Sequence, residues 1–233
     1  MNARCRSIRL GALATAVLLL GCSEARRYDQ AICALVDVSG TYADQKAEVA
    51  KILKRDVLLG MVPGDTLIVI QIDSESYERE NLVALMTLDQ RPSRANAQKL
   101  ALARKLDRFA SSEAGSKYTD IPGAMMLGSE YLREQPSGSR VMLVFSDMRE
   151  DLPQGSRRQL AETEFEGIHV VALNVKRLGS DNADPQSFRG RLVAWEDRVR
   201  AAGALGWRTF MDAAKLPAYL ETLRSSGEGA PTV

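Results

Sequence analysis

The chain has 233 residues, of which 45% are hydrophobic and 26% charged, with 31 Lys and Arg against 30 Asp and Glu. This near-neutral balance excludes a broadly basic surface, so we expect no nucleic-acid partner. The length suits one domain with a full hydrophobic core.

Residues 1–21 have the pattern of a secretory signal. Three arginines precede an apolar run over residues 10–20, which is about half of the ~20 residues that span a bilayer. The following LLGC, ending in Cys22, resembles the bacterial lipobox, in which the signal is cut before a cysteine that is then acylated. The resemblance implies lipidation of Cys22, a short tether over residues 22–29 and a lipid-anchored location in the cell envelope. A plain signal peptide is the alternative.

Removal of residues 1–21 takes away three arginines and no acid, which brings the net charge from +1 to −2. Cys5 leaves with this segment, and Cys22 would carry lipid. Cys33 is then without a partner for an intramolecular disulfide and is expected to be a small core residue. In lipoproteins of this kind, Ser23 in place of Asp favours the outer membrane where a cell has two.

Residues 30–224 are expected to form one domain, followed by a polar tail over residues 225–233. Short apolar runs predict strands at residues 31–36, 66–72, 81–88, 141–145, 168–175 and 207–210. Apolar residues at helical spacing predict helices around residues 49–57, 102–109, 188–199 and 216–223. The third strand follows so closely on the second that we expect an antiparallel edge. The alternation predicts an α/β fold, a doubly wound, mostly parallel sheet with helices on both faces.

Oxygen-bearing side chains follow two of these strands. Asp37, Ser39 and Thr41 come directly after the first strand, and Asp147 follows strand 141–145. Thr119 lies in a loop at the start of the helix between them. Because ligands of such sheets bind beyond the carboxyl ends of the strands, we expect these five side chains at one edge.

The DxSxT sequence, the later Thr and the Asp after a strand resemble the metal-ion-dependent adhesion site of von Willebrand factor type A domains, and the resemblance covers about residues 30–224. It implies that Ser39 and Thr41 place hydroxyl oxygens directly on a divalent cation. Thr119 would bind directly or through water, and Asp37 and Asp147 through waters or directly. Thr41 stands where the family usually has Ser.

Two further departures from the family pattern follow Asp147. Met148 replaces the usual glycine, and Glu150 and Asp151 add negative charge close to the site. The oxygen set still suits Mg²⁺, with Mn²⁺ or Ca²⁺ as alternatives, and not zinc. An open coordination position would accept an Asp or Glu carboxylate from a partner protein. The set supplies no nucleophile and no base for turnover, so we expect a binding module and not an enzyme.

Three other interpretations stay open. The residues around Asp37 can be a polar loop that caps the next helix. The domain can keep the fold as a structural lipoprotein whose site no longer binds metal. The sequence DVSGT also resembles the loop of haloacid-dehalogenase-type phosphatases, with Asp37 as nucleophile. In that family a second acid stands where this chain has Ser39, and Lys176 lacks the expected acidic pair.

The remaining polar candidates are expected to be structural. His169, the single histidine, begins an apolar strand and has no second histidine with which to bind a metal. Arg189 and Arg191 are expected on an exposed helix face, and Trp195 at core spacing on the same helix.

Overall fold

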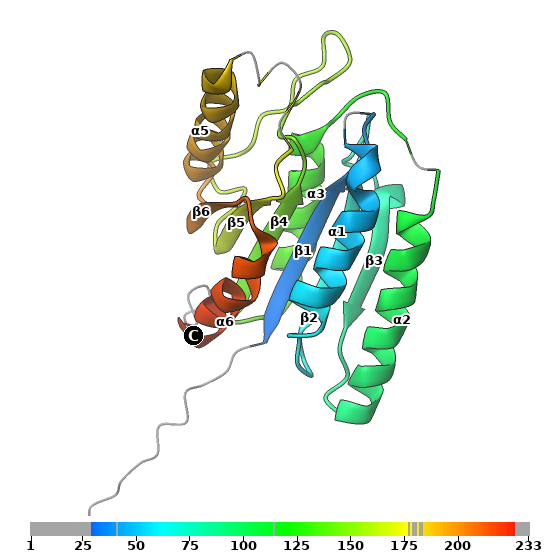
Figure 1. The fold of residues 1–233 in the computed structure, drawn as a ribbon. Helices are drawn as coiled ribbons and strands as arrows, with labels where there is room; N and C mark the ends of the chain where they lie inside the picture. Colours follow the sequence, from blue (N-terminus) through cyan, green and yellow to red (C-terminus); the bar gives the residue numbers. More distant parts are fainter. Residues whose placement is uncertain are drawn as a thin grey trace, which may run out of the picture.

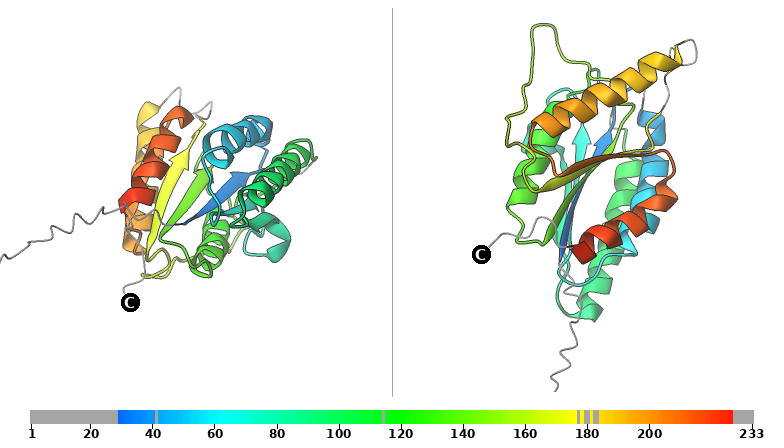
Figure 2. Two further views of the ribbon diagram at one scale, coloured as in Figure 1. Left: turned by 90° about the horizontal axis from the view of Figure 1, so that it is seen from below. Right: turned by 90° about the vertical axis from the view of Figure 1, so that its left-hand side faces the viewer.

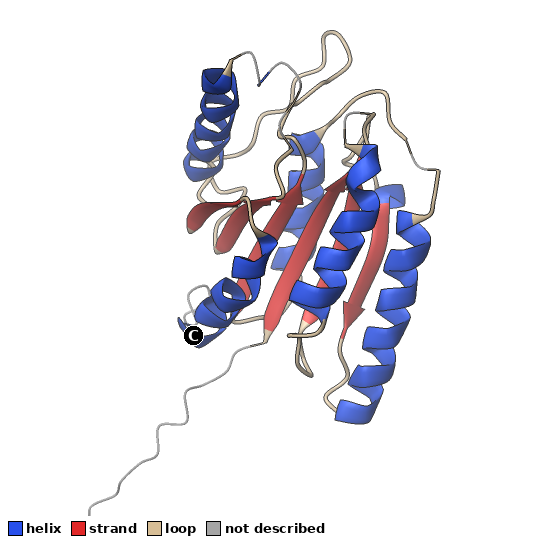
Figure 3. Ribbon diagram, in the orientation of Figure 1, coloured by secondary structure: helices blue, strands red, loops and turns tan. Residues whose placement is uncertain are grey.

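A six-stranded sheet of order β3-β2-β1-β4-β5-β6 forms the centre of the protein (Figures 1 and 3). The computed structural model describes residues 29–40, 42–113, 115–176, 178, 181 and 184–226. Every neighbouring pair of strands is parallel except β2 and β3, which are antiparallel. The predicted doubly wound sheet and its antiparallel edge are therefore confirmed. The strands are β1 (Gln30–Asp37), β2 (Thr66–Ile72), β3 (Leu82–Thr87), β4 (Ser139–Phe145), β5 (Ile168–Leu173) and β6 (Gly206–Phe210).

Helices cover both faces of the sheet. One face is covered by α1, α2 and α6, and the other by α3 and α5. The right-hand view of Figure 2 shows α5 and α6 on opposite sides of β6. The helices are α1 (Lys46–Ile52), α2 (Pro92–Ala110), α3 (Ile121–Arg133), α5 (Pro185–Ala201) and α6 (Leu216–Ser226), with short 3₁₀ turns η1 (Ala43–Gln45), η3 (Arg79–Asn81) and η4 (Ala213–Lys215).

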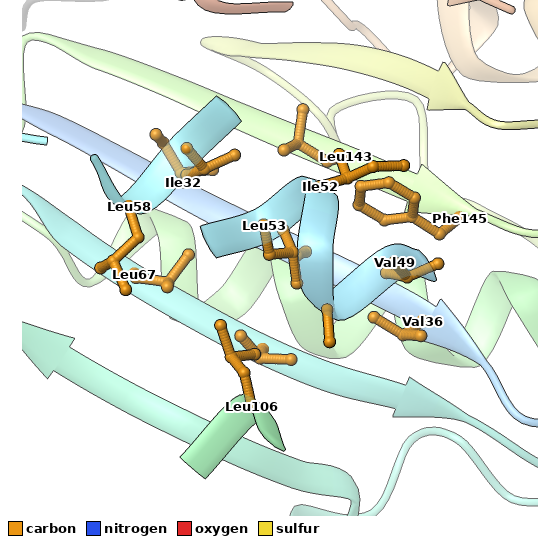
Figure 4. Close-up of a cluster of buried hydrophobic side chains, with 14 of the residues drawn as sticks. Ile32, Val36, Val49, Ile52, Leu53, Leu58, Leu67, Leu106, Leu143 and Phe145 are labelled. Atoms are coloured by element: carbon orange, nitrogen blue, oxygen red, sulfur yellow. The ribbon is translucent and has the colours of Figure 1, made fainter. Parts of the chain in front are cut away.

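The core follows from strands that are apolar on both sides. Along β1, Ile32 and Val36 face α1 and α2, whereas Cys33 and Leu35 face α3. Figure 4 shows how the first set meets residues of α1 and of the neighbouring strands. Cys33 is fully buried, and this burial raises the pKa of its thiol well above the ordinary value. It is a core residue, as expected.

The helix that begins with α1 changes its pitch half-way along. Residues Leu53–Leu58 form a π-helical segment, η2, and the Leu59 N–H donates to the carbonyl of Lys54, five residues earlier, over 3.2 Å. Leu53 and Leu58 are both buried, whereas Leu59 is 73% exposed. The wider turn thus places two leucines five residues apart on the same buried face.

Among the boundaries that differ from the expected ones are the ends of β5 and α6. β5 ends at Leu173, two residues early, because Asn174 adopts a left-handed conformation with φ 50° that no strand accommodates. α6 continues to Ser226, past the expected start of the tail at residue 225.

The described residues contain no helix long and apolar enough to cross a bilayer. The predicted signal, Cys22 and residues 23–28 of the predicted tether lie outside them, as do residues 227–233 of the predicted tail.

Candidate metal site at the carboxyl edge of the sheet

Two aspartates lie side by side at the carboxyl edge of the sheet, the upper edge in Figure 1. β1 and β4 are parallel neighbours in which Val36 pairs with Phe145, so Asp37 at the end of β1 lies beside Asp147, two residues after the end of β4. Their side chains are 0% and 1% exposed. Two carboxylates withdrawn from water at one strand edge are costly unless another group compensates their charge.

The carboxylate of Asp37 is held in place by its neighbours. The Ser39 N–H donates to Oδ1 over 2.8 Å, and the Ser146 hydroxyl donates to Oδ2 over 2.7 Å. Burial raises the pKa of Asp37, hydrogen bonds from Ser146 and Ser39 act in the opposite direction, and the charge of Asp147 raises it further. The charged form of Asp37 is thus disfavoured in the folded protein, and a nearby cation would stabilise it.

The two carboxylate oxygens of Asp147 differ in their hydrogen bonding. Oδ1 accepts a hydrogen bond from the Arg149 N–H over 2.8 Å, but Oδ2 is buried and accepts none from the described residues. A buried carboxylate oxygen without a donor is rare and calls for water or a cation. The side chains present therefore fit the divalent ion that the sequence pattern implies.

The loop that carries Thr119 closes the other side of the site. The Ser116 N–H donates to the carbonyl of Val38 over 3.2 Å, which places this loop beside the residues that follow β1. Thr119 and Asp151 exchange two backbone hydrogen bonds, of 2.6 and 3.1 Å. A pocket of about 220 Å³ results, lined by Ser39, Gly40, Ser116, Lys117, Thr119, Arg149 and Asp151.

The structure thus brings Asp37, Ser39, Thr119 and Asp147 to one edge, and Thr41 lies outside the described residues. Within those residues no group of three or more His, Cys, Asp or Glu side chains is arranged to hold a metal. The predicted site has two carboxylates, and its other ligands are hydroxyls.

The sequence matches no protein-family model and no curated protein. Solved structures are similar at low identity. The PilB minor pilin from Streptococcus sanguinis is 11% identical, with a TM-score of 0.50 over 88% of this chain and 62% of the pilin. A von Willebrand factor type A protein from Catenulispora acidiphila is 13% identical, with a TM-score of 0.49 over 87% of this chain and 43% of that protein. BatB from Bacteroides thetaiotaomicron is also 13% identical, with a TM-score of 0.49 over 85% of this chain and 98% of BatB.

At such identities the comparisons concern the fold alone. The observed fold, a mostly parallel six-stranded sheet with helices on both faces, is the α/β architecture that the sequence resemblance implies. This chain covers 43% of the Catenulispora acidiphila protein and 62% of the pilin, in both cases less than two thirds of their length.

Met148 stands where the sequence resemblance implies a glycine, and its backbone adopts a conformation that glycine accommodates readily. Its φ is +62°, in the left-handed region that costs about 1–2 kcal/mol for a residue with a Cβ and little for glycine. Its side chain is 1% exposed in the core between the sheet and α5. The buried thioether offsets the backbone cost, so the turn forms without glycine.

One face of α5 holds the turn that carries Asp147. Arg191 donates to the Asp147 carbonyl over 3.0 Å, and the Trp195 indole donates to the Met148 carbonyl over 2.8 Å. Arg198 pairs with the Glu150 carboxylate at 2.6 Å. Because these three residues are spaced by four and three positions, they share one helix face.

The expectation that Arg191 is solvated beside Arg189 is therefore wrong. Arg191 forms a bidentate ion pair with the buried Asp181, at 2.7 and 3.2 Å, in addition to its bond with the site turn. Sequence reasoning also missed Ser146, whose hydroxyl joins Asp37 to the backbone N–H of Met148. The spacing of residues 191, 195 and 198 was the signal available for α5, whereas nothing in the sequence singled out Ser146.

Proposed function

We propose that this protein is an exported, lipid-anchored module of the cell envelope that binds a protein partner through a divalent cation. The cation, Mg²⁺ or alternatively Mn²⁺ or Ca²⁺, would be held by Asp37, Ser39, Thr41, Thr119 and Asp147. When bound, it would supply an open coordination position for an Asp or Glu carboxylate of the partner.

One observation carries this proposal: the buried Oδ2 of Asp147, beside the buried Asp37, accepts no hydrogen bond from any residue that the structure describes. Two desolvated carboxylates without a cationic side chain bonded to them are unfavourable by themselves. Neutral hydroxyls complete an oxygen set that suits a hard divalent ion. The pocket next to Ser39 and Thr119 gives a ligand access from solvent.

The direction of β1 supports an outward-facing site. Cys22 would lie eight residues before Gln30, where β1 begins, and the site follows Asp37 at the other end of this strand. An eight-residue strand is about 25 Å long. A domain tethered by residues 22–29 would therefore keep its candidate site away from the lipid, and Ser23 favours the outer membrane.

The phosphatase interpretation has less support. A nucleophilic Asp37 needs a free carboxylate oxygen, but both of its oxygens accept hydrogen bonds and the side chain is buried. Lys176, the candidate lysine of that reading, pairs with the exposed Asp44 at 2.9 Å. Release of phosphate from p-nitrophenyl phosphate, lost in Asp37→Asn, would instead favour the enzyme.

Calorimetric titration of Mg²⁺ tests the site. Asp37→Ala should abolish binding, and Asp44→Ala serves as the matched control because Asp44 is an exposed aspartate of η1, seven residues after Asp37. At about one hundred times the dissociation constant, Mg²⁺ should stabilise the wild-type domain by about 2.7 kcal/mol. Equal Mg²⁺ affinity in Asp37→Ala and wild type would refute the assignment and leave a type A-like structural lipoprotein.

The anchor is tested separately. Metabolic labelling with a fatty acid should tag the wild-type protein in the envelope fraction. Cys22→Ala should abolish the label, and Cys33→Ala should keep it. Label retained in Cys22→Ala would contradict the proposed anchor.

A further inference from the structure

Two cationic side chains line the pocket of the candidate metal site. A cationic side chain cannot be a ligand of a metal ion, so the proposed ion does not explain their presence. Lys117 precedes Thr119 by two residues, and Arg149 follows Asp147 by two residues. Both are exposed, and neither forms an ion pair with another described residue. The Lys117 ammonium lies 5.1 Å from the centroid of the Tyr118 ring, its own neighbour in the chain.

The backbone fixes these cations on opposite sides of the site. The Thr119–Asp151 bridge is antiparallel, so residues two positions before each partner extend in opposite directions from it. The Arg149 N–H is bonded to the Asp147 carboxylate. The loop before Lys117 is bonded to Val38, directly after β1. A ligand seated at Thr119 would therefore have one cation on either side.

The charges of the surrounding residues favour an acidic ligand with several carboxylates. Asp37 and Asp147 together formally balance a divalent ion. Glu150 is paired with Arg198, which offsets its negative charge. The pocket lining then carries Lys117, Arg149 and one acid, Asp151. An isolated ligand carboxylate would use the ion and leave both cations unpaired.

We propose that the partner segment is a run of acidic residues, not a single Asp or Glu in neutral surroundings. One carboxylate of the run would bind the ion, and its neighbours would pair with Lys117 and Arg149. This inference rests on the metal-dependent binding proposed above and names the chemistry of the partner. Exposed ion pairs are individually weak and screened by salt, so the run adds selectivity at low ionic strength.

Two peptides and two double variants test the inference with the full chain. The probes are a fluorescent seven-residue glycine peptide with one central Asp and the same peptide with three consecutive Asp. Lys117→Gln with Arg149→Gln removes both cations. Arg104→Gln with Lys105→Gln, on the exposed side of α2, makes the same change of charge away from the pocket.

In Mg²⁺ at low salt, the wild type and the α2 control should bind the three-Asp peptide about tenfold more tightly than the one-Asp peptide. The pocket variant should lose this preference and keep its affinities for Mg²⁺ and for the one-Asp peptide. A wild type that binds Mg²⁺ and both peptides equally, or a pocket variant that keeps the preference, would overturn the acidic run alone. A wild type that binds no Mg²⁺, or binds the three-Asp peptide equally in a chelator, would overturn the metal-dependent function itself.

Discussion

Trp195 of α5 donates its indole N–H to the carbonyl of Met148 over 2.8 Å. This hydrogen bond attaches the turn that follows Asp147 to the helix that covers it. The acceptor belongs to a residue held at φ +62°. The bond therefore joins the conformation of the site turn to the packing of the outer helix.

Trp195→Phe should destabilise the domain by about 1–3 kcal/mol, because it leaves a buried carbonyl without a donor. It should also weaken Mg²⁺ binding, since the turn that carries Asp147 loses one of its attachments. Urea unfolding and Mg²⁺ calorimetry measure the two effects. Trp207→Phe is the matched control. It removes the same ring volume from the core, but the indole of Trp207 forms no hydrogen bond with a described residue. If the two variants bind Mg²⁺ with equal affinity, the bond has no role in the site.

The left-handed backbone of Met148 predicts an inverted order of stability for two truncations. Met148→Gly should be more stable than Met148→Ala by about 1 kcal/mol, although both lose the buried thioether. At Met125, inside α3, the order should be the usual one, with alanine more stable than glycine by about the same amount. Thermal or chemical unfolding of the four variants measures the order of their stabilities. An alanine variant more stable than the glycine variant at both positions would disprove the left-handed turn.

Burial of Asp37 predicts a pH dependence of the metal-free domain. Its pKa in the folded state is raised above the ordinary value of 3.8, mainly by burial. Between that value and the raised one, the folded state binds more protons than the unfolded state, so stability falls as pH rises through the folded-state pKa. Asp37→Asn should remove this loss and stabilise the metal-free protein at neutral pH. Urea unfolding from pH 4 to pH 8 in a chelator, with Asp44→Asn as control, tests the sign.

The expected end of the domain at residue 224 coincides with a buried ion pair. Arg224 of α6 donates two hydrogen bonds to Asp65, at 2.8 and 2.6 Å, and both side chains are almost fully buried. Arg224→Leu should cost about 3 kcal/mol or more, because it leaves the Asp65 charge without its cation.

Arg200→Leu is the control for Arg224→Leu, since Arg200 pairs with Glu196 at 2.8 Å on the exposed side of α5. Its cost in urea unfolding should stay below about 1 kcal/mol. Similar losses in the two variants would show that burial of the Arg224 pair contributes nothing.

The sheet was predictable because its strands are apolar on both sides and are separated by helical spacing. A strand such as 66–72 has apolar side chains on both faces, and both faces are buried only when helices cover each side of the sheet. The position of Asp37 followed directly, since a parallel strand that ends in polar residues presents them at the ligand-binding edge. Asp37, Ser39 and Asp147 could be located in this way, and the structure places them at one edge together with Thr119.

The contacts made by α5 were not predictable, because a helix that is charged along most of its length looks solvated. Arg191 has the same sequence surroundings as Arg189, yet only Arg191 reaches a buried acid and the site turn. Charge alone does not reveal whether a tertiary partner exists. The φ angle of Met148 was equally hidden, because methionine gives no local signal for a left-handed backbone.

The π-helical turn at Leu53–Leu58 has a consequence for chain length. Regular α-helical hydrogen bonds over this stretch would require one residue fewer between Ile52 and Met61. The segment therefore carries a surplus residue that the fold absorbs without moving either end of the helix. A natural sequence variant shorter by one position is more readily accommodated here than within any regular helix of the molecule, where the same loss would turn every later side chain by about 100°.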